Sequence, residues 1–219
     1  MNTNTPPADP VPPLPAAFRA RVDALLAGGG RQLLGLVGPP GAGKSTLAIA
    51  LHRAFATVSQ IVPMDGYHLA NVELARLGRA GRKGAPDTFD SAGYVSLLRR
   101  LRVQRDDEIV YAPEFRREIE EPIAGAIAVL PTTRLVITEG NYLLLEQGAW
   151  AEVAALLDDS WYVAIDAGLR NQRLLARHEQ FGRSPDAAAA WVASTDEPNA
   201  RLIDSTRARA RVEFRWGGE

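Results

Sequence analysis

The sequence predicts an α/β fold in which a parallel β-sheet is covered by helices on both faces. Residues 135–139 and 161–166 are apolar runs with the length of buried strands, and segments with helical spacing of apolar residues separate them. A third apolar run, residues 33–37, passes through a glycine-rich turn into the apolar segment 46–50, which is the order strand, loop, helix. Continuous apolar strands that alternate with helices are typical of such a sheet.

The remaining helices are predicted from helical spacing of apolar residues, and the remaining strands from short apolar runs. Helical spacing predicts helices over residues 16–27, 44–57, 93–102, 169–181 and 186–194. Short apolar runs predict strands over residues 61–64, 108–112 and 123–129, with a small β-subregion between the last two, and one or two final strands around residues 202–203 and 212–214. Residues 71–90 are polar, basic and glycine-rich, so we expect an exposed segment on the substrate side or an ordinary solvated loop.

Composition limits the functional classes. The formal net charge of -1 gives no reason to expect binding to nucleic acid or to an anionic membrane, and no apolar run has the length of a membrane span. The absence of cysteine excludes disulfides and thiolate catalysis and fits a reducing, cytoplasmic location. Residues 1–15 are proline-rich without a basic residue, so we expect a flexible tail before a single domain over residues 16–219.

Residues 38–45 read GPPGAGKS and match the phosphate-binding pattern G-x-x-x-x-G-K-[ST]. In such a loop the backbone N–H groups and the helix N-terminus converge on phosphate oxygens, Lys44 reaches the β- and γ-phosphates, and the Ser45 hydroxyl binds Mg²⁺. Thr46, at the last position of a G-x-G-x-x-G comparison, excludes a dinucleotide fingerprint, and the missing Asn-Lys-x-Asp run argues against a GTPase. The predicted nucleotide-binding residues are Gly38, Gly41, Ala42, Gly43, Lys44, Ser45 and Thr46.

Acidic residues end three predicted strands: Asp65, Glu139 and Asp166. Ligands of a parallel sheet gather at the carboxyl ends of its strands. Transfer of phosphate to an alcohol needs a carboxylate beside the attacking hydroxyl, a lysine and Mg²⁺ on the phosphate, and mobile arginines above it. Alternative interpretations are a turn residue before Gly66 for Asp65, a capping or surface acid for Glu139, and a structural role for Asp166.

Several motifs resemble one superfamily of kinases. Residues 64–68 (MDGYH) resemble the D-G-F/Y-H segment of bacterial pantothenate kinases and the D-x-F-Y segment of uridine kinases and phosphoribulokinases. Residues 82–90 (RKGAPDTFD), 110–113 (VYAP) and 137–144 (ITEGNYLL) follow in the order that this superfamily uses, and the likeness covers residues 33–206. The whole pattern is most similar to nucleoside/nucleotide kinase family proteins labelled "putative fructose transport system kinase".

This resemblance implies a P-loop kinase fold with a substrate-side insertion and a lid over about residues 169–185. It implies that Asp65 is the general base and that Glu139 lies near Mg²⁺ and the substrate. It places Arg173 and Arg177 over ATP, although their spacing alone suits a solvated helix face equally well. The residues implied at the acceptor are Tyr67, His68, Lys83, Tyr111, Arg117, Glu139 and Asn141.

The sequence departs from its relatives at two places. Residues 115–117 read Phe-Arg-Arg where relatives often carry an acid, and two adjacent cations favour an anionic acceptor or a phosphate over a neutral sugar. The lid helix ends in Arg-His-Glu at residues 177–179 rather than in a longer arginine run.

We therefore expect an ATP- and Mg²⁺-dependent enzyme that phosphorylates a hydroxyl of a small metabolite, such as a nucleoside, a pantothenate-like compound or a sugar. The alternative is a nucleotide-dependent regulatory ATPase or switch that acts on a protein partner. The expected partners are ATP and a small-molecule acceptor, with a homodimer as a candidate assembly and neither nucleic acid nor membrane.

Overall fold

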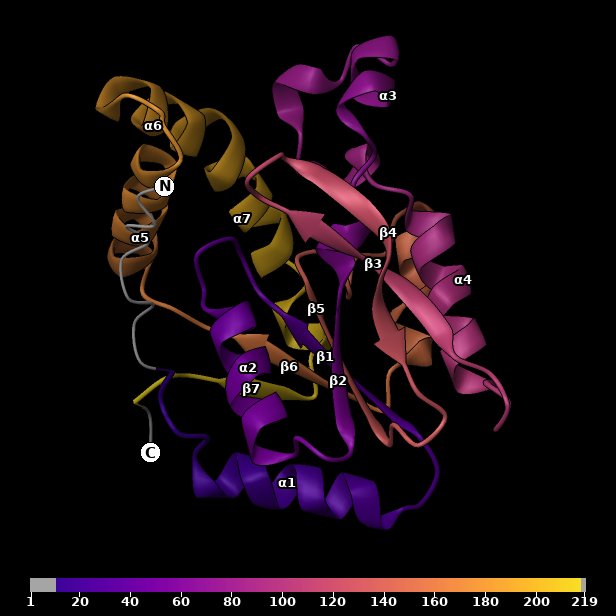
Figure 1. The fold of residues 1–219 in the computed structure, drawn as a ribbon. Coiled ribbons are helices and arrows are strands. Elements are labelled where there is room, and N and C mark those ends of the chain that lie inside the picture. The colour runs from indigo at the N-terminus through magenta and orange to yellow at the C-terminus, as the bar shows by residue number, and fades with distance from the viewer. Residues whose placement is uncertain (1–10, 218–219) are drawn as a thin grey trace, which may run out of the picture.

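Five parallel strands form the central sheet, in the order β2-β5-β1-β6-β7 (Figure 1). The computed structural model describes residues 11–217. The strands of this sheet are β1 (Gln32–Val37), β2 (Ser59–Pro63), β5 (Leu135–Gly140), β6 (Asp159–Val163) and β7 (Val212–Phe214). A separate antiparallel hairpin joins β3 (Val110–Arg116) to β4 (Glu121–Val129). The expected parallel α/β fold is thereby confirmed.

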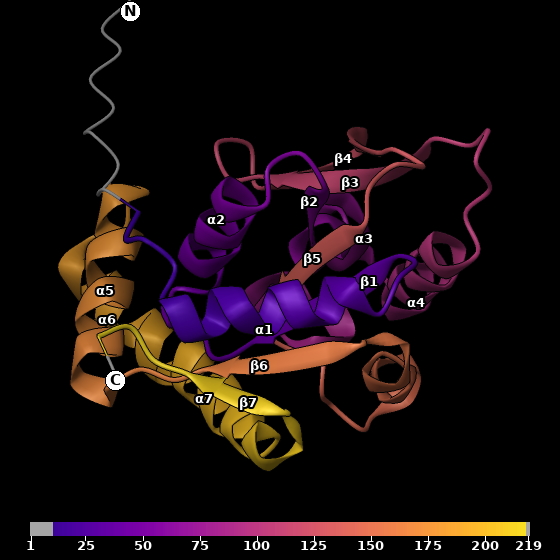
Figure 2. The same ribbon diagram turned by 90° about the horizontal axis from the view of Figure 1, so that it is seen from below.

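Helices cover both faces of the sheet. They are α1 (Ala16–Ala27), α2 (Lys44–Ala54), α3 (Asn71–Arg76), α4 (Ser91–Arg102), α5 (Ala167–Gln180), α6 (Pro185–Trp191) and α7 (Glu197–Asp204). On one face, Leu34 and Leu36 of β1 pack in a buried cluster with residues of α1 and α2. On the other, Leu33 and Val37 pack in a cluster with residues of α4 and α7. Figure 2 shows α1 in front of the sheet, running alongside β6.

The alternation of β1 side chains between these clusters explains why the apolar run lacks a polar face. Side chains of successive strand residues point to opposite faces, and here both faces are covered by helices. Every residue from Leu33 to Val37 is buried as a result. All five strands of the sheet run parallel, so their carboxyl ends meet at one edge, where the phosphate-binding loop follows β1.

Several predicted elements differ from the structure. Residues 202–203 lie in α7 and not in a strand, because Ala200 and Ile203 point into the core at helical spacing. The helix expected over residues 44–57 ends at Ala54. The segment 71–90 contains α3 and two 3₁₀ turns, and its Leu74 and Thr88 are fully buried, so it is more than a solvated loop. The helix expected over residues 186–194 gives way after Trp191 to a π-helical turn, Val192–Asp196, which leads into α7.

The predicted tail falls mostly outside the description, since residues 1–10 are not part of it, and residues 11–15 form neither helix nor strand. Within the described part of the chain no helix combines the length and the apolar character needed to cross a membrane.

Candidate active site

The phosphate-binding loop connects β1 to α2, and its backbone geometry requires glycine at two points. Gly43 has a φ of 91° and precedes α2 as its N-cap, without a side chain that caps the helix. At Gly38 a Cβ atom would lie 2.7 Å from the carbonyl oxygen of Val163, which excludes any larger residue. The first N–H groups of α2 are therefore left for a ligand, and together with the positive end of the helix dipole they suit a phosphate.

Lys44 folds back over this loop. Its Nζ atom donates hydrogen bonds to the carbonyl oxygens of Gly38 at 2.8 Å and Pro39 at 3.1 Å, and to Oδ1 of Asn141 at 2.8 Å. Burial lowers the pKa of Lys44, while the negative charges of Glu139 and Asp65 oppose that change. An anion nearby would stabilise a buried ammonium whose partners are neutral carbonyl oxygens, so this arrangement fits a phosphate beside Lys44.

Ser45 and Glu139 meet beside the lysine. The Ser45 hydroxyl donates a hydrogen bond to Oε1 of Glu139 at 2.9 Å, and the Glu139 side chain is buried near the end of β5. Burial raises the pKa of Glu139, and the neighbouring charge of Asp65 raises it further. A hydroxyl beside a buried carboxylate is the donor set that Mg²⁺ accepts together with phosphate oxygens and water. Within residues 11–217, no three His, Cys, Asp or Glu side chains are grouped to hold a metal ion.

Asp65 lies at the same edge of the sheet as Glu139. It belongs to the 3₁₀ turn Met64–Tyr67 directly after β2, and Pro63 at the end of β2 pairs with Glu139 of β5. Its backbone oxygen accepts a hydrogen bond from the N–H of His68 at 3.1 Å within the turn, and Asp65 lines the central cavity. Nη2 of Arg117 donates a hydrogen bond to Oδ2 of Asp65 at 3.3 Å.

One cavity of about 970 Å³ joins these groups. The phosphate-binding loop lines one part of it, and Asp65 and Glu139 line it as well. The other predicted site residues on its wall are Gly41, Gly43, Lys44, Ser45, Thr46, His68, Lys83, Arg117, Asn141, Arg173 and Arg177.

Comparisons with known proteins identify relatives of this chain. No protein-family model matches the chain. The chain is 40% identical over 152 residues to the "ATP-dependent kinase-like protein notR'" of Aspergillus versicolor, an alignment that covers 66% of this chain and 88% of that protein. It is 37% identical over 157 residues to the "Putative uridine kinase C227.14" of Schizosaccharomyces pombe, covering 68% of this chain and 66% of that protein.

A solved structure gives the same result. The crystal structure of a "putative fructose transport system kinase" from Silicibacter sp. TM1040 superposes with a TM-score of 0.82 at 38% identity, covering 90% of this chain and 98% of that one. This chain belongs to the ATP-dependent P-loop kinases. The resemblance to uridine kinase-like P-loop kinases that the sequence motifs indicated is confirmed.

Some predicted residues of this kinase lie off the cavity wall. Gly38 and Ala42 of the phosphate-binding loop are not on the wall, and Ala42 is buried in the core. Tyr67 packs edge-on against Tyr94 with ring centroids 5.4 Å apart, and burial raises the pKa of Tyr67 to about 12. Tyr111 lies on β3 with 56% of its surface exposed. The structure does not bring these two tyrosines to the cavity, so we leave them out of the proposed acceptor site.

Other residues of the kinase line the cavity without having been expected from the sequence. Among them are aromatic residues and residues of the segment after α5, including Phe115, Trp191, Asp196 and Trp216. Asp196 lies in the π-helical turn, where its Oδ2 is 2.7 Å from Nε2 of His178. π-Helical turns are frequent at functional sites, but a turn of that kind carries no sequence signal that we could use.

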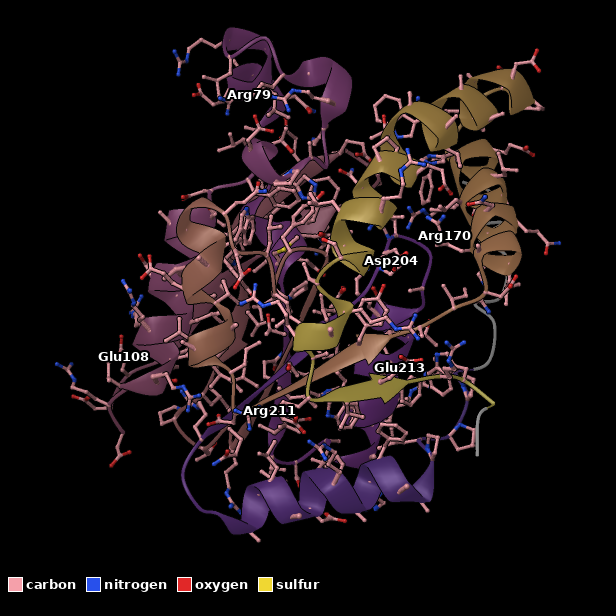
Figure 3. The ribbon with its side chains drawn as sticks, turned by 180° about the vertical axis from the view of Figure 1, so that it is seen from behind. Arg79, Glu108, Arg170, Asp204, Arg211 and Glu213 are labelled. Carbon is pink, nitrogen blue, oxygen red and sulfur yellow. The ribbon has the colours of Figure 1, made fainter. Side chains whose placement is uncertain are left out.

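The arm formed by α5, α6 and α7 is anchored by charged residues. Asp166 caps α5 by accepting a hydrogen bond from the N–H of Leu169 at 3.0 Å, which confirms its structural role. The buried guanidinium of Arg170 on α5 forms a salt bridge with Glu197 at the start of α7. Figure 3 shows Arg170 on α5 and Asp204 at the far end of α7. The lid expected over about residues 169–185 thus coincides with most of α5 and the turn to α6, and its movement stays a prediction.

Proposed function

We propose that this kinase transfers the γ-phosphate of ATP to a hydroxyl group of a small metabolite. One observation carries the proposal: the carboxylate of Asp65 and the phosphate-binding loop line the same cavity. Asp65 and Lys44 are close enough for the charge of the aspartate to raise the pKa of the lysine. A hydroxyl between them would have a proton acceptor on one side and the transferred phosphate on the other.

The reaction balances with these groups. The acceptor oxygen forms a bond to the γ-phosphorus as the bond from that phosphorus to the β,γ-bridging oxygen breaks, and ADP leaves. The carboxylate of Asp65 takes the proton of the hydroxyl. Lys44 and the N–H groups at the start of α2 bind the phosphates and stabilise the charge that is transferred. Asn141, which binds Nζ of Lys44, keeps that side chain near the loop.

Mg²⁺ fits the donors beside this loop. Ser45 and Glu139 would hold it with phosphate oxygens and water, and the ion would neutralise charge on the β- and γ-phosphates. Arg177 of α5 is a candidate to cover the same phosphates. Burial lowers its pKa, and the charge of Arg117 lowers it further, so an anion in the cavity would relieve both effects.

ADP release from ATP tests this function. We expect one compound of a metabolite library to stimulate ADP release by the purified protein, in proportion to the phosphorylated product formed. A Lys44→Ala variant should lose that stimulation, whereas Arg105→Ala, in an exposed ion pair with Asp107, should keep it. ADP release that responds to a protein partner and to no small molecule would overturn the proposal in favour of a regulatory ATPase.

A further inference from the structure

Two cations stand on the part of the cavity wall that carries Asp65. Lys83 follows the 3₁₀ turn after α3, and Arg117 follows the last residue of β3, so two separate segments supply them. Both lie over the ring of Phe115: Nζ of Lys83 is 5.1 Å and Cζ of Arg117 is 5.8 Å from its centroid. The three side chains line the cavity together.

Lys83 and Arg117 each keep N–H groups that donate to no protein atom among the described residues. Nζ of Lys83 donates to Oδ1 of Asn71 at 2.7 Å and to the backbone oxygen of Glu120, which uses two of three protons. Within the described residues, Arg117 makes one hydrogen bond, the 3.3 Å contact with Asp65, although a guanidinium carries five N–H donors. Burial lowers the pKa of Lys83 more than the charges of Glu121 and Glu120 raise it.

Lys83 and Arg117 add positive charge to a cavity whose wall also carries the acidic residues Asp65 and Glu120. Burial is the main cause of the lowered pKa of Lys44, Arg177 and His68, and the charge of Arg117 lowers each of them further. The nearby carboxylate of Asp65 is engaged by Arg117, but catalysis needs it for the acceptor hydroxyl. An anionic group on the acceptor, close to its hydroxyl, would bind Arg117 in place of Asp65 and leave the Asp65 carboxylate free to take the proton.

The aromatic residues here do not favour a stacked base. The ring of His68 lies 4.6 Å from that of Phe115 and 4.0 Å from that of Phe89, so these rings pack against each other. The two cations cover Phe115 and present charge to the cavity where a neutral nucleoside would need an open apolar surface.

We propose that the acceptor is a small hydroxylated acid, with its hydroxyl at Asp65 and its carboxylate or phosphate between Lys83 and Arg117. This inference rests on the proposed function and narrows its substrate class. Arg117 can bind either a carboxylate or a phosphate through two N–H groups, and Lys83 adds a point charge that suits both anions.

Matched acceptor pairs test the inference on the whole protein. Turnover would be compared for glycerate and glycerol, gluconate and glucose, fructose 6-phosphate and fructose, and uridine 5′-monophosphate and uridine. We expect product only from anionic members. Comparison of the first two pairs, which carry a carboxylate, with the last two, which carry a phosphate, shows which anion is recognised. A neutral member that is phosphorylated with an equal or higher kcat/KM than its acid would overturn the inference while leaving the proposed function intact.

Variants supply a readout that does not depend on finding the natural substrate. With a non-hydrolysable ATP analogue bound, malonate and inorganic phosphate should raise the Tm of the wild type, and Lys83→Gln and Arg117→Gln should abolish the rise. Arg105→Gln, in an exposed ion pair with Asp107 and off the cavity wall, is the matched control. An equal rise in all variants, or none in the wild type, would overturn the inference.

For an acid that proves to be a substrate, Lys83→Gln should raise its KM about 10- to 100-fold, the range for a charged hydrogen bond, with KM for ATP changed less than about twofold. Lys83→Arg should restore part of the loss. An unchanged KM for the acid in Lys83→Gln and Arg117→Gln would contradict the inference. A wild-type protein that does not bind ATP would instead contradict the proposed function.

Discussion

The Ser45 hydroxyl donates a hydrogen bond to the carboxylate of Glu139 across 2.9 Å, and so joins the start of α2 to the end of β5. The two residues are 94 positions apart in the sequence. They meet because β1 and β5 are parallel neighbours, with Leu36 opposite Glu139, so the loop after β1 begins beside the end of β5. The fold thereby places the carboxylate next to the phosphate-binding loop, where the Ser45 and Glu139 oxygens would both ligate a divalent cation.

Glu139→Gln should lower kcat/KM by about 100-fold, because an amide oxygen supports Mg²⁺ and the developing charge less well than a carboxylate. The amide still accepts the hydrogen bond from Ser45, so the fold should persist. Steady-state kinetics at several Mg²⁺ concentrations would measure the loss. Glu146→Gln, in an exposed ion pair with Arg209, serves as the control, and equal activity of the two variants would contradict the role of Glu139.

The same substitution should stabilise the ligand-free protein at neutral pH. Burial and the charge of Asp65 raise the folded-state pKa of Glu139 above its unfolded value. A raised pKa contributes stability that is fully present below the unfolded pKa, about 4.3, and is lost as the pH rises through the folded pKa. Glutamine has no such dependence, so we expect Glu139→Gln to have a higher Tm than the wild type at pH 8 and a similar Tm near pH 4. A lower Tm of the variant at pH 8 would refute this sign.

Asp65→Asn tests the proposed base directly. Asparagine keeps the shape of the side chain and a contact for Arg117 but cannot take the hydroxyl proton, so kcat should fall by about 100-fold or more. The affinity for ATP, measured by calorimetry, should change less than about twofold. Asp107→Asn, an exposed acid paired with Arg105, should behave as the wild type. Undiminished kcat in Asp65→Asn would refute the assignment.

The sequence was sufficient to predict those parts of the site that depend on short-range signals. The loop of residues 38–45 follows a buried strand, and Asp65 and Glu139 end or follow other strands of the parallel sheet, so a common edge could be inferred. Helix α1 has the same bounds as its predicted range because three glycines end its apolar periodicity.

Other features depend on tertiary packing. Tyr111 falls in a segment that resembles acceptor-binding sequences, yet its place on β3 turns it to solvent, because strand register decides which face each residue occupies. Ile203 is part of a short apolar pair that suits strand or helix, and only its packing in the core with Ala200 distinguishes them. Trp216 reaches the cavity through its position after β7, a strand of three residues.

Arg21 should contribute to the attachment of α1. It donates hydrogen bonds to both oxygens of Asp159, at 2.6 and 3.0 Å. Burial alone would raise the pKa of Asp159, but hydrogen bonds from Arg21 and Trp161 lower it below its usual value. Arg21→Ala should cost about 1–3 kcal/mol of unfolding free energy at pH 7, less than for a fully buried pair because the Arg21 side chain is 41% exposed.

The pH dependence of that loss has a defined sign. A lowered pKa contributes stability that is present above the unfolded pKa, about 3.9, and is lost as the pH falls through the folded pKa. Urea unfolding should therefore show the difference between Arg21→Ala and the wild type at pH 7 and a smaller one below pH 4. A difference that stays constant with pH would show that Arg21 acts by packing alone.

Trp216 should report on the bound nucleotide. A Cβ atom at Gly43 would lie 3.4 Å from Nε1 of Trp216 and 3.9 Å from Nη1 of Arg173, so both side chains reach the loop. An indole beside a nucleotide can stack on the base, a contact worth about 1–3 kcal/mol in other base-binding proteins. Trp216→Ala should thus raise KM for ATP about tenfold with little change in KM for the acceptor, and Trp216→Phe should keep most of the affinity. Trp191→Phe is the matched control, because Trp191 lines the same cavity on α6. ATP should quench tryptophan fluorescence in the wild type and in Trp191→Phe but much less in Trp216→Phe; the reverse pattern would place the base beside Trp191 and refute the assignment.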